Sequence, residues 1–239
     1  MKNLRLPYDG FQIREVLFKK IIESEFRKKE IVEALEAGCG RKWSLTEANV
    51  KFKITGVDLD KPAYLIRKDK FNDIQEFHHM SLEDFTETER FDFVYCVDVL
   101  EHCHNTRVIF DNLIRSLKRG GIALIAYPNK NSIFGRITYH TPHWFHVLFY
   151  RFVYKNLNAG KSGYGPYPVI YEDFLEPKKF ERSCEENSEV EIEYKITREY
   201  DHRRIGIFSY LYRPFASLIA VFFGKKTLTS GLIYIIRKS

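Results

Sequence analysis

A short glycine-containing stretch and an acidic residue further along carry the clearest chemical signal in this sequence. The stretch reads Glu36-Ala37-Gly38-Cys39-Gly40 and closes an apolar run. Glycines at the end of a strand allow a tight turn and let a ligand approach the backbone closely. Asp58 closes the next apolar run, and an acid in that place accepts hydrogen bonds from ribose hydroxyls. Together the two features predict a site for a cofactor that contains a nucleoside.

The residues after the glycines discriminate between two such cofactors. A dinucleotide needs a helix N-terminus close to its pyrophosphate, and a third glycine permits that approach. Here Trp43 holds the third position, after the bulky pair Arg41-Lys42. S-adenosylmethionine has no pyrophosphate, and its amino acid and sulfonium suit a Gly-x-Gly turn beside an acid such as Glu36. We therefore predict S-adenosylmethionine, with a nicotinamide cofactor as the less favoured alternative.

Apolar runs and helical patterns alternate around these motifs. Five runs are predicted strands, and they span residues 31–37, 53–58, 77–80, 91–97 and 122–127. An amphipathic helix over residues 11–29 precedes them, and Asn105 is expected to cap a later helix that Gly120-Gly121 ends. Strands that alternate with helices imply right-handed crossovers and a parallel sheet.

Two further strands are predicted near the C-terminus, over residues 190–197 and 232–236, after a helix that begins at Pro177. The predicted fold is therefore α/β, a Rossmann-like doubly wound seven-stranded sheet closed by an antiparallel member. We expect one domain over residues 1–239. Its parts are an N-terminal helix (1–30), a cofactor-binding core (31–127), a cap or substrate insertion (128–173) and the C-terminal part of the sheet (174–239).

The insertion after the fifth strand, residues 128–173, interrupts the alternation. It is rich in Tyr and Phe, and it contains His140, His143, Trp144 and His146 among several glycines. A stretch of this length is uncommon as a plain connection and often carries function. We predict an aromatic cap that covers the site, because a mixture of polar and aromatic groups suits a substrate lid.

Six short motifs follow one another within residues 31–129. They are Glu36-Ala37-Gly38-Cys39-Gly40, Gly56-Val57-Asp58, Ser81-Leu82-Glu83-Asp84, Phe91-Asp92-Phe93-Val94, Val99-Leu100-Glu101-His102 and Leu117-Lys118-Arg119-Gly120-Gly121. In this order they resemble the class I S-adenosylmethionine-dependent methyltransferases. The resemblance is to the type-11-like small-molecule group, which includes the ubiquinone-biosynthesis O-methyltransferases. It implies methyl transfer, with O-methylation of a small molecule, a sugar or a lipid-linked acceptor as the expected reaction.

Carried over by position, the resemblance predicts which residues contact the cofactor. They are Glu36, Gly38, Cys39, Gly40, Asp58, Leu59, Ser81, Leu82 and Val97. The two glycines would line the methionine part, with Glu36 beneath the loop, and Asp58 would hold the ribose hydroxyls. Leu59 would touch the adenine face and Ser81 the adenine edge. The Leu82 backbone N–H would also meet that edge, and Val97 would lie near the reacting centre.

Methyl transfer from a sulfonium asks mainly that the acceptor be held in line with the methyl group. An oxygen acceptor also needs a base, and histidine is the usual choice at neutral pH. The candidates are His102, His140, His143 and His146. No metal site is expected, because the histidine and cysteine pairs are adjacent and their side chains diverge.

Composition restricts the partners. The net charge is +6, with the basic residues scattered, and Asp98-Val99-Leu100-Glu101 differs from the Asn/Asp-Pro-Pro-aromatic run of methyltransferases that act on base amines. Nucleic acid is therefore an unlikely partner. The four cysteines lack paired spacing, and with no signal-peptide pattern at the N-terminus the sequence predicts a cytoplasmic protein.

The role of one apolar segment and one rival function are left open by the sequence. Residues 205–223 are apolar around Arg213, so they are a candidate for peripheral membrane contact, for packing on the sheet or for a homodimer surface. The rival function is a non-catalytic binding or partner subunit that keeps the fold. Intact Gly38, Gly40 and Asp58 argue against that rival.

Overall fold

A computed structural model describes residues 1–6, 10–199, 210 and 229–239 of the chain. The strands are β1 (Lys2–Leu6), β2 (Val32–Ala37), β3 (Phe52–Val57), β4 (Glu76–His78), β5 (Phe91–Val97), β6 (Leu117–Pro128), β7 (Val190–Glu199) and β8 (Thr229–Lys238). The α-helices are α1 (Gly10–Phe26), α2 (Lys61–Lys70), α3 (Thr106–Ser116), α4 (Ile133–His140), α5 (His143–Phe152) and α6 (Pro177–Glu186). Two 3₁₀ turns lie at Leu100–His102 and Asp173–Leu175.

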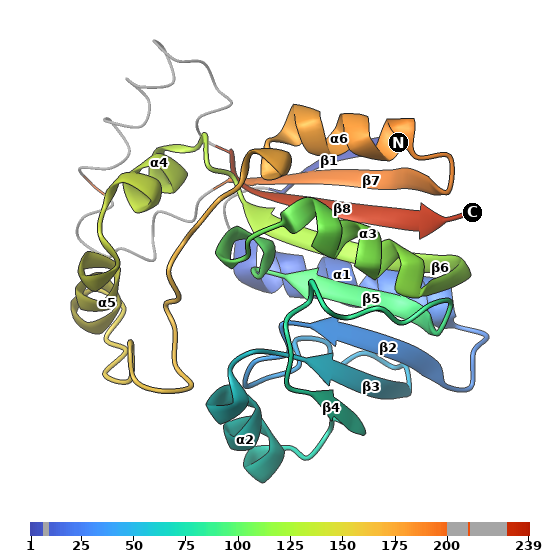
Figure 1. Cartoon of the computed structure of the whole chain (residues 1–239), viewed down its shortest axis with the longest axis horizontal. Helices are drawn as coiled ribbons and strands as arrows, with labels where there is room; N and C mark the ends of the chain where they lie inside the picture. The colour runs from blue at the N-terminus through green and yellow to red at the C-terminus, as the bar shows by residue number, and fades with distance from the viewer. Residues whose placement is uncertain (7–9, 200–209, 211–228) are drawn as a thin grey trace.

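All the described strands belong to one mixed sheet in the order β1-β7-β8-β6-β5-β2-β3-β4 (Figure 1). The strands from β4 to β6 run parallel, and β8 is antiparallel to both β6 and β7. The predicted α/β architecture with an antiparallel closing strand is confirmed. The predicted number of seven strands is wrong, because residues 1–30 hold a strand as well as a helix. That strand, β1, pairs in parallel with β7 and makes eight.

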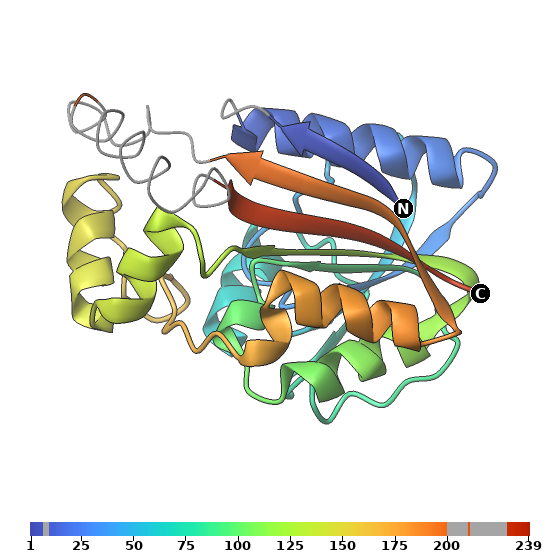
Figure 2. The same ribbon diagram turned by 90° about the horizontal axis from the view of Figure 1, so that it is seen from above.

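Helices cover both faces of the sheet, as the edge-on view in Figure 2 shows for α1 on one side and for α3 and α6 on the other. The face under α1 buries Phe18, Ile22 and Phe26 against strand residues such as Phe93. The opposite face buries the apolar side of α3 and α6 against the alternate strand positions. Central strands buried on both faces are rich in apolar residues, as in β5 and β6.

The connection from β2 to β3, residues 38–51, contains no helix, so the predicted alternation is wrong at this point. Trp43 and Leu45 from this connection are buried in the core layer beneath α1. The Trp43 ring packs edge-on against Phe52 and Tyr95, with ring centroids 5.4 and 5.1 Å apart. A buried indole thus fills space on this face that a crossover helix commonly occupies in α/β sheets.

The ends of α3 also differ from the prediction. Asn105 occupies the position before the helix, but in a left-handed conformation with no capping bond from its side chain. The cap comes from Glu172, whose carboxylate accepts from the N–H groups of Asn105 and Thr106. At the other end the helix stops at Ser116, and Gly120-Gly121 lies within β6 rather than ending a helix.

The insertion over residues 128–173 consists of α4, α5 and an irregular segment that returns toward α6. Both helices lie beyond the carboxyl ends of the central parallel strands (Figure 1). Ser132 begins α4 by accepting a hydrogen bond from the Gly135 N–H at 2.9 Å. Within the part of the chain that the structure describes, no helix has both the length and the apolar character that a bilayer crossing requires.

Candidate active site

The glycine loop after β2 has the backbone shape that its sequence predicts. Gly38 and Gly40 both have positive φ, +70° and +50°, a region that favours glycine. A Cβ at Gly38 would lie 2.3 Å from a methyl group of Val99, so this position excludes any side chain. A Cβ at Gly40 would have only the Gly38 carbonyl oxygen within 4.0 Å. The face of the loop at Gly40 is therefore open to a ligand.

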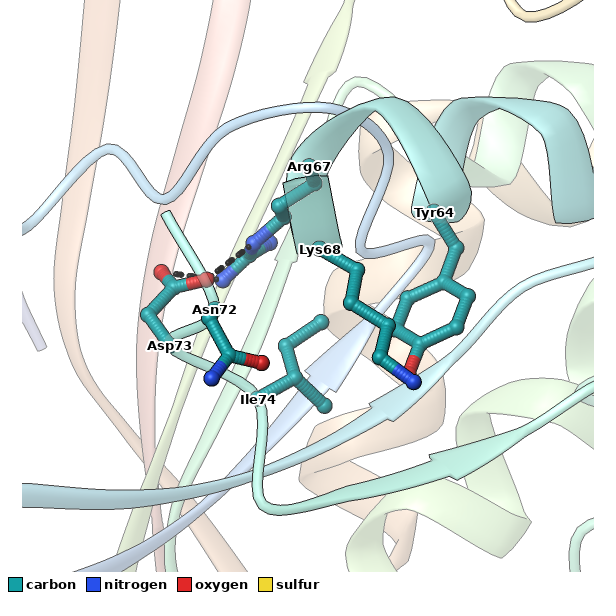
Figure 3. A pocket seen from close by; sticks show the side chains of 6 residues that line it. All are labelled: Tyr64, Arg67, Lys68, Asn72, Asp73 and Ile74. Carbon is teal, nitrogen blue, oxygen red and sulfur yellow. Dashed lines mark hydrogen bonds and ion pairs between the residues drawn. The ribbon is translucent and has the colours of Figure 1, made fainter. Parts of the chain in front are cut away.

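A buried ion-pair network supports the loop from below, as expected for Glu36. The Arg67 guanidinium of α2 donates to the Glu36 carboxylate and to the Cys39 carbonyl oxygen, both at 2.7 Å. The same guanidinium binds both carboxylate oxygens of Asp73, at 2.8 and 2.9 Å (Figure 3). Burial raises the pKa of Glu36 to about 8, against the lowering effect of Arg67. The network fixes the carbonyl of the loop, and the small hollow that Figure 3 shows beside it has no room for a ligand.

Cys39 itself points away from the open face of the loop. Its side chain is buried, and its Sγ would lie 3.0 Å from a Cβ added to Gly56 on β3. Burial raises the pKa of the thiol, which keeps it protonated. A contact between Cys39 and the cofactor therefore involves its backbone, and it stays a prediction.

Asp58 lies just beyond the end of β3 and joins that strand to the glycine loop. One carboxylate oxygen accepts from the Gly40 N–H and the other from the Asp60 N–H, both at 2.7 Å. Burial raises the pKa of Asp58, while these two N–H groups lower it. A carboxylate has about four acceptor positions. Asp58 therefore keeps capacity for ribose hydroxyls while it holds the loop.

The other predicted cofactor residues follow Asp58 around the carboxyl edge of the sheet. Leu59 is 67% exposed, which leaves its side chain free to contact a ligand. Ser81 accepts a hydrogen bond from the Glu83 N–H at 3.2 Å. Leu82 is buried, and within the described chain no hydrogen bond uses its N–H. Val97 is half-buried at the end of β5.

The turn after β5 gathers charged groups beside the glycine loop. Asp98 has a left-handed backbone and accepts from Arg14 of α1 at 3.1 Å. Glu101 is 3% exposed, and its Oε2 has no hydrogen-bond partner in the described chain. Burial raises the pKa of Glu101 well above its usual range, and the nearby Asp98 charge adds to this effect. The buried site therefore disfavours the ionised form of Glu101.

His102 follows Glu101, and its environment fixes both its tautomer and its charge. Its Nδ1 lies 2.7 Å from the Pro168 carbonyl oxygen, which can only accept, so Nδ1 carries the proton. Its Nε2 then presents a lone pair, 3.7 Å from Glu101 Oε1. Burial lowers the pKa of His102, although the Pro168 carbonyl and the Asp98 charge raise it. The side chain is 24% exposed, so solutes can reach it.

The three histidine candidates of the insertion are less well placed. His143 and His146 begin α5 with their rings 6.2 Å apart, and the His146 Nε2 lies 2.7 Å from the Thr141 hydroxyl. Burial, and then the His143 charge, lower the pKa of His146. The charge of His143 also lowers the pKa of His102, so the start of α5 lies within electrostatic range of the turn after β5. His140 lies at the end of α4 against Tyr139.

The irregular part of the insertion crosses the carboxyl edge of the sheet and contacts both halves of the site. The Tyr167 hydroxyl donates to Asp60 at 2.6 Å, and the Arg41 guanidinium lies 4.2 Å from the Tyr164 ring centroid. A Cβ at Gly163 would lie 3.1 Å from the Ala63 backbone nitrogen at the start of α2. On the other side, the Ile170 N–H donates to the Glu101 carbonyl oxygen at 2.8 Å. The segment thus bridges the glycine loop and the turn after β5.

Sequence reasoning missed several residues of this arrangement. Arg67, Tyr167 and Glu172 act through partners distant in sequence and leave no local pattern. Arg14 did leave a signal, because it shares a helical stripe with Phe18 and Ile22, and a charge on an apolar stripe needs a buried partner. Glu101 belonged to a recognised motif, but the sequence assigned it no role.

The donor set fits S-adenosylmethionine. The face of the loop at Gly40 is open, Asp58 has spare acceptor capacity, and Leu59 offers an exposed apolar side chain. No glycine-rich turn is followed by a helix N-terminus in residues 38–51, which a pyrophosphate would require. This geometry disfavours a dinucleotide, as the sequence predicted, but the structural reason is that no helix follows the turn, rather than the bulk of Trp43.

Comparison with known proteins agrees with this geometry. Residues 10–159 match a family model described as a methyltransferase domain. The ubiquinone biosynthesis O-methyltransferase of Glaesserella parasuis is 25% identical over 194 residues, which are 77% of this chain and 70% of that protein. The same-named protein of Rickettsia bellii is 26% identical over 113 residues. That match spans 46% of this chain but only about half, 47%, of the relative.

Solved structures show the same fold at low sequence identity. A putative S-adenosylmethionine-dependent methyltransferase from Listeria monocytogenes matches with a TM-score of 0.58 and 14% identity, over 96% of this chain and 100% of its own. The N-methyltransferase NodS of Bradyrhizobium japonicum, in complex with S-adenosyl-L-homocysteine, matches with a TM-score of 0.54 and 12% identity. That match covers 95% of this chain and 86% of NodS. The family match, the glycine loop and the acid after β3 lead to one conclusion: this chain belongs to the methyltransferase-domain family and is an S-adenosylmethionine-dependent methyltransferase.

Proposed function

We propose that this chain transfers the methyl group of S-adenosylmethionine to an oxygen atom of a small molecule, a sugar or a lipid-linked acceptor, with His102 as the general base. The state of the His102 side chain carries the proposal. Its Nδ1–H donates to the Pro168 carbonyl oxygen, and burial keeps the imidazole neutral, so Nε2 can accept a proton. A hydroxyl is a poor nucleophile until such a base removes its proton.

The surroundings of His102 support the same assignment. Burial, and then the nearby Asp98 charge, raise the pKa of the neighbouring Glu101 carboxyl, which disfavours its ionised form beside His102. Tyr171, whose hydroxyl is buried without a partner in the described chain, lies on the segment that bonds to the Glu101 carbonyl oxygen. These groups offer hydrogen-bonding capacity that an oxygen-containing acceptor would satisfy.

The cofactor supplies an activated methyl group, so the protein must chiefly orient the acceptor and exclude water. The insertion segment that joins Asp60 to His102 is the part of the chain suited to this task, since Tyr167 and Pro168 contact both. The printed name of the Glaesserella parasuis relative, an O-methyltransferase, agrees with an oxygen acceptor.

Matched acceptor pairs test the proposal. The purified chain and S-adenosylmethionine are incubated with catechol or ortho-phenylenediamine, and with a sugar or its amino-sugar counterpart. Binding of S-adenosyl-L-homocysteine is measured in parallel by calorimetry. We expect methyl groups on oxygen, located by mass spectrometry and NMR of the product. Methylation of the nitrogen partners alone would refute the oxygen assignment. Tight binding of S-adenosyl-L-homocysteine without turnover of any acceptor would favour the non-catalytic alternative.

The partners named from the sequence remain proposals. Residues 205–223, the candidate for membrane contact or a homodimer surface, lie outside the described residues except for Tyr210. The cytoplasmic location likewise stays a prediction.

A further inference from the structure

A hollow of about 200 Å³ lies where the chain leaves β6 and enters α4. Its lining residues are Lys130, Asn131, Arg136, Tyr139 and His140. They come from the turn after β6 and from α4, which Figure 1 shows beyond the carboxyl ends of the parallel strands. The hollow therefore lies on the same edge of the sheet as the turn after β5, because Val97 and Ala126 pair at the ends of those two strands.

Every side chain that lines this hollow can donate a hydrogen bond, and three of them can carry a positive charge. Of the described residues that line it, none is acidic. The Arg136 side chain has no ion pair or hydrogen bond within the described chain. Asp173, which is near enough for Lys130 to lower its pKa, pairs with Lys179 at 3.0 Å. Among the described residues, no carboxylate pairs with Arg136, and Asp173 is already held by Lys179.

Hydrogen bonds and close packing hold the backbone next to the hollow in place. The Asn129 side chain accepts from the Asn131 N–H at 3.0 Å and donates to the Thr229 carbonyl oxygen of β8 at 2.9 Å. A Cβ at Gly135 would lie 2.1 Å from the Asn129 carbonyl oxygen, so only glycine lets α4 approach this turn so closely. These bonds fix the start of α4, and therefore the backbone positions of Arg136 and His140 relative to the turn that holds Lys130.

Lys130 connects the hollow to the acceptor side of the site. Its Nζ lies 3.9 Å from the Tyr139 ring centroid and 3.5 Å from the Tyr171 carbonyl oxygen. The Tyr171 N–H in turn donates to the Glu101 carbonyl oxygen at 3.2 Å. Tyr171 therefore contacts both Lys130 of the hollow and the backbone of the turn that holds Glu101 and His102.

We propose that this hollow binds a phosphate group carried by the methyl acceptor, so that the acceptor is anionic. This inference rests on the proposed function and specifies its substrate class. A phosphate offers more charge and more acceptor oxygens than a carboxylate, which matches a lining of several donors. The phosphate belongs either to a soluble compound or to a lipid headgroup, and both satisfy the same side chains.

Pyrophosphate serves as the soluble probe, and its binding is followed by ³¹P NMR at low ionic strength. The variant Arg136→Gln removes one charge without breaking a bond of the described chain. Its matched control is Arg119→Gln, which removes the same charge near the start of β6, with Arg119 81% exposed. We expect Arg136→Gln to weaken pyrophosphate binding about tenfold, as the loss of one charge-assisted hydrogen bond predicts, and Arg119→Gln to leave it within about twofold. Equal effects of the two variants would overturn the proposal. So would a wild-type chain that binds neither pyrophosphate nor the phosphatidylglycerol vesicles described next.

Vesicles distinguish the two sources of phosphate. The same proteins are mixed with vesicles of phosphatidylcholine alone and with vesicles that also contain phosphatidylglycerol. Binding that requires phosphatidylglycerol and is lost in Arg136→Gln assigns the phosphate to a lipid headgroup. Binding of pyrophosphate without vesicle binding assigns it to a soluble acceptor. Calorimetry with S-adenosyl-L-homocysteine runs beside both arms, and Arg136→Gln should keep wild-type affinity there. If the wild-type chain does not bind S-adenosyl-L-homocysteine, the proposed function fails. The pyrophosphate and vesicle results then still decide whether the hollow binds phosphate.

Discussion

Two pairs of acidic residues at opposite ends of the parallel strands have different surroundings. At the amino ends, lysines hold Glu33 and Asp92: Lys118 of β6 contacts both, and Lys29, which precedes β2, contacts Asp92. Asp92 contacts Lys29 at 2.5 Å and Lys118 at 3.2 Å, and Glu33 contacts Lys118 at 2.9 Å. At the carboxyl ends, Asp58 accepts only from backbone N–H groups, and Glu101 keeps one oxygen, Oε2, without a hydrogen-bond partner in the described chain.

The pKa shifts follow this difference. Bonds from Lys118 and Lys53 lower the pKa of Glu33, and bonds from Lys29, the Glu33 N–H and Lys118 lower that of Asp92 although burial raises it. At the other end burial dominates and raises the pKa values of Asp58 and Glu101. Charges that are paired stabilise the fold. Carboxyl groups that are held by backbone N–H groups, or that keep an oxygen without a hydrogen-bond partner, retain hydrogen-bonding capacity for a ligand.

Replacement of the base should produce the largest effect. We expect His102→Gln to lower kcat by about 10²–10⁴-fold, because glutamine cannot accept a proton from the acceptor. As the pH falls, the wild-type rate should decline with a midpoint below 6.5, since burial lowers the pKa of His102 from that ordinary value. In His102→Gln this decline should be absent.

The control for that variant is His104→Gln, an exposed histidine two residues away. It should keep the wild-type rate and pH profile. Equal loss of rate in both variants would show that the effect is a disturbance of the turn rather than loss of a base.

Two glycines with positive φ, one at each end of the sheet, offer a matched test of the loop. Gly38→Ala and Gly120→Ala both force a side chain into the left-handed region, at about 1–2 kcal/mol each in the free energy of unfolding. Gly38→Ala also clashes with Val99, whereas nothing lies within 4 Å of a Cβ at Gly120. We expect Gly38→Ala to weaken binding of S-adenosyl-L-homocysteine by about 100-fold, or about 2.7 kcal/mol. Calorimetry should find wild-type affinity for S-adenosyl-L-homocysteine in Gly120→Ala. A similar loss of affinity in Gly120→Ala would show that the cofactor site does not depend on the glycine loop in particular.

Asp92→Asn should affect stability and spare the cofactor. Loss of charge-assisted bonds to a side chain only 6% exposed should lower the free energy of unfolding by about 1–3 kcal/mol at pH 7. Because the folded pKa of Asp92 lies below its ordinary value of 3.8, its contribution is complete above 3.8 and is lost as the pH falls through the folded value. Urea unfolding at several pH values should therefore show the two proteins converging in acid. A difference that persists there would contradict this account.

Asp58→Asn is the isosteric counterpart at the carboxyl end, and it should show the smallest effect. An amide oxygen still accepts one hydrogen bond but loses the charge, so affinity for S-adenosyl-L-homocysteine should fall about tenfold. The free energy of unfolding should change less than in Asp92→Asn, because the Asp58 carboxylate forms no ion pair in the described chain. If instead stability fell and affinity did not, Asp58 would serve the fold alone.

The features that the sequence predicted correctly depend on local patterns. The strands from β2 to β6 appear as apolar runs, and the conformation of Gly38 and Gly40 follows from residue type. β1 escaped notice because Lys2–Leu6 is short and polar, and it exists only through pairing with β7. The cap of α3 was assigned to Asn105 on residue type, but Glu172 supplies it from 67 residues further along the chain.

In the candidate active site, too, features with a local sequence pattern were predicted and those that depend on distant partners were not. The sequence placed Glu36 beneath the loop, yet Arg67, which holds both Glu36 and the Cys39 carbonyl, was hidden within the charged run Arg67-Lys68-Asp69-Lys70. It named four histidines without ranking them, because the bond from His102 to Pro168 spans 66 residues. Side-chain roles that depend on distant partners are not encoded in any local spacing.

The packing of Trp43 gives the chain a natural optical reporter. The protein has two tryptophans; Trp43 is buried three residues after Gly40, while Trp144 on α5 is 63% exposed. The buried indole, whose Nε1 has no hydrogen-bond partner in the described chain, should emit at shorter wavelength than the solvated one. Intrinsic fluorescence can therefore separate events at the cofactor loop from events at the insertion, without a label.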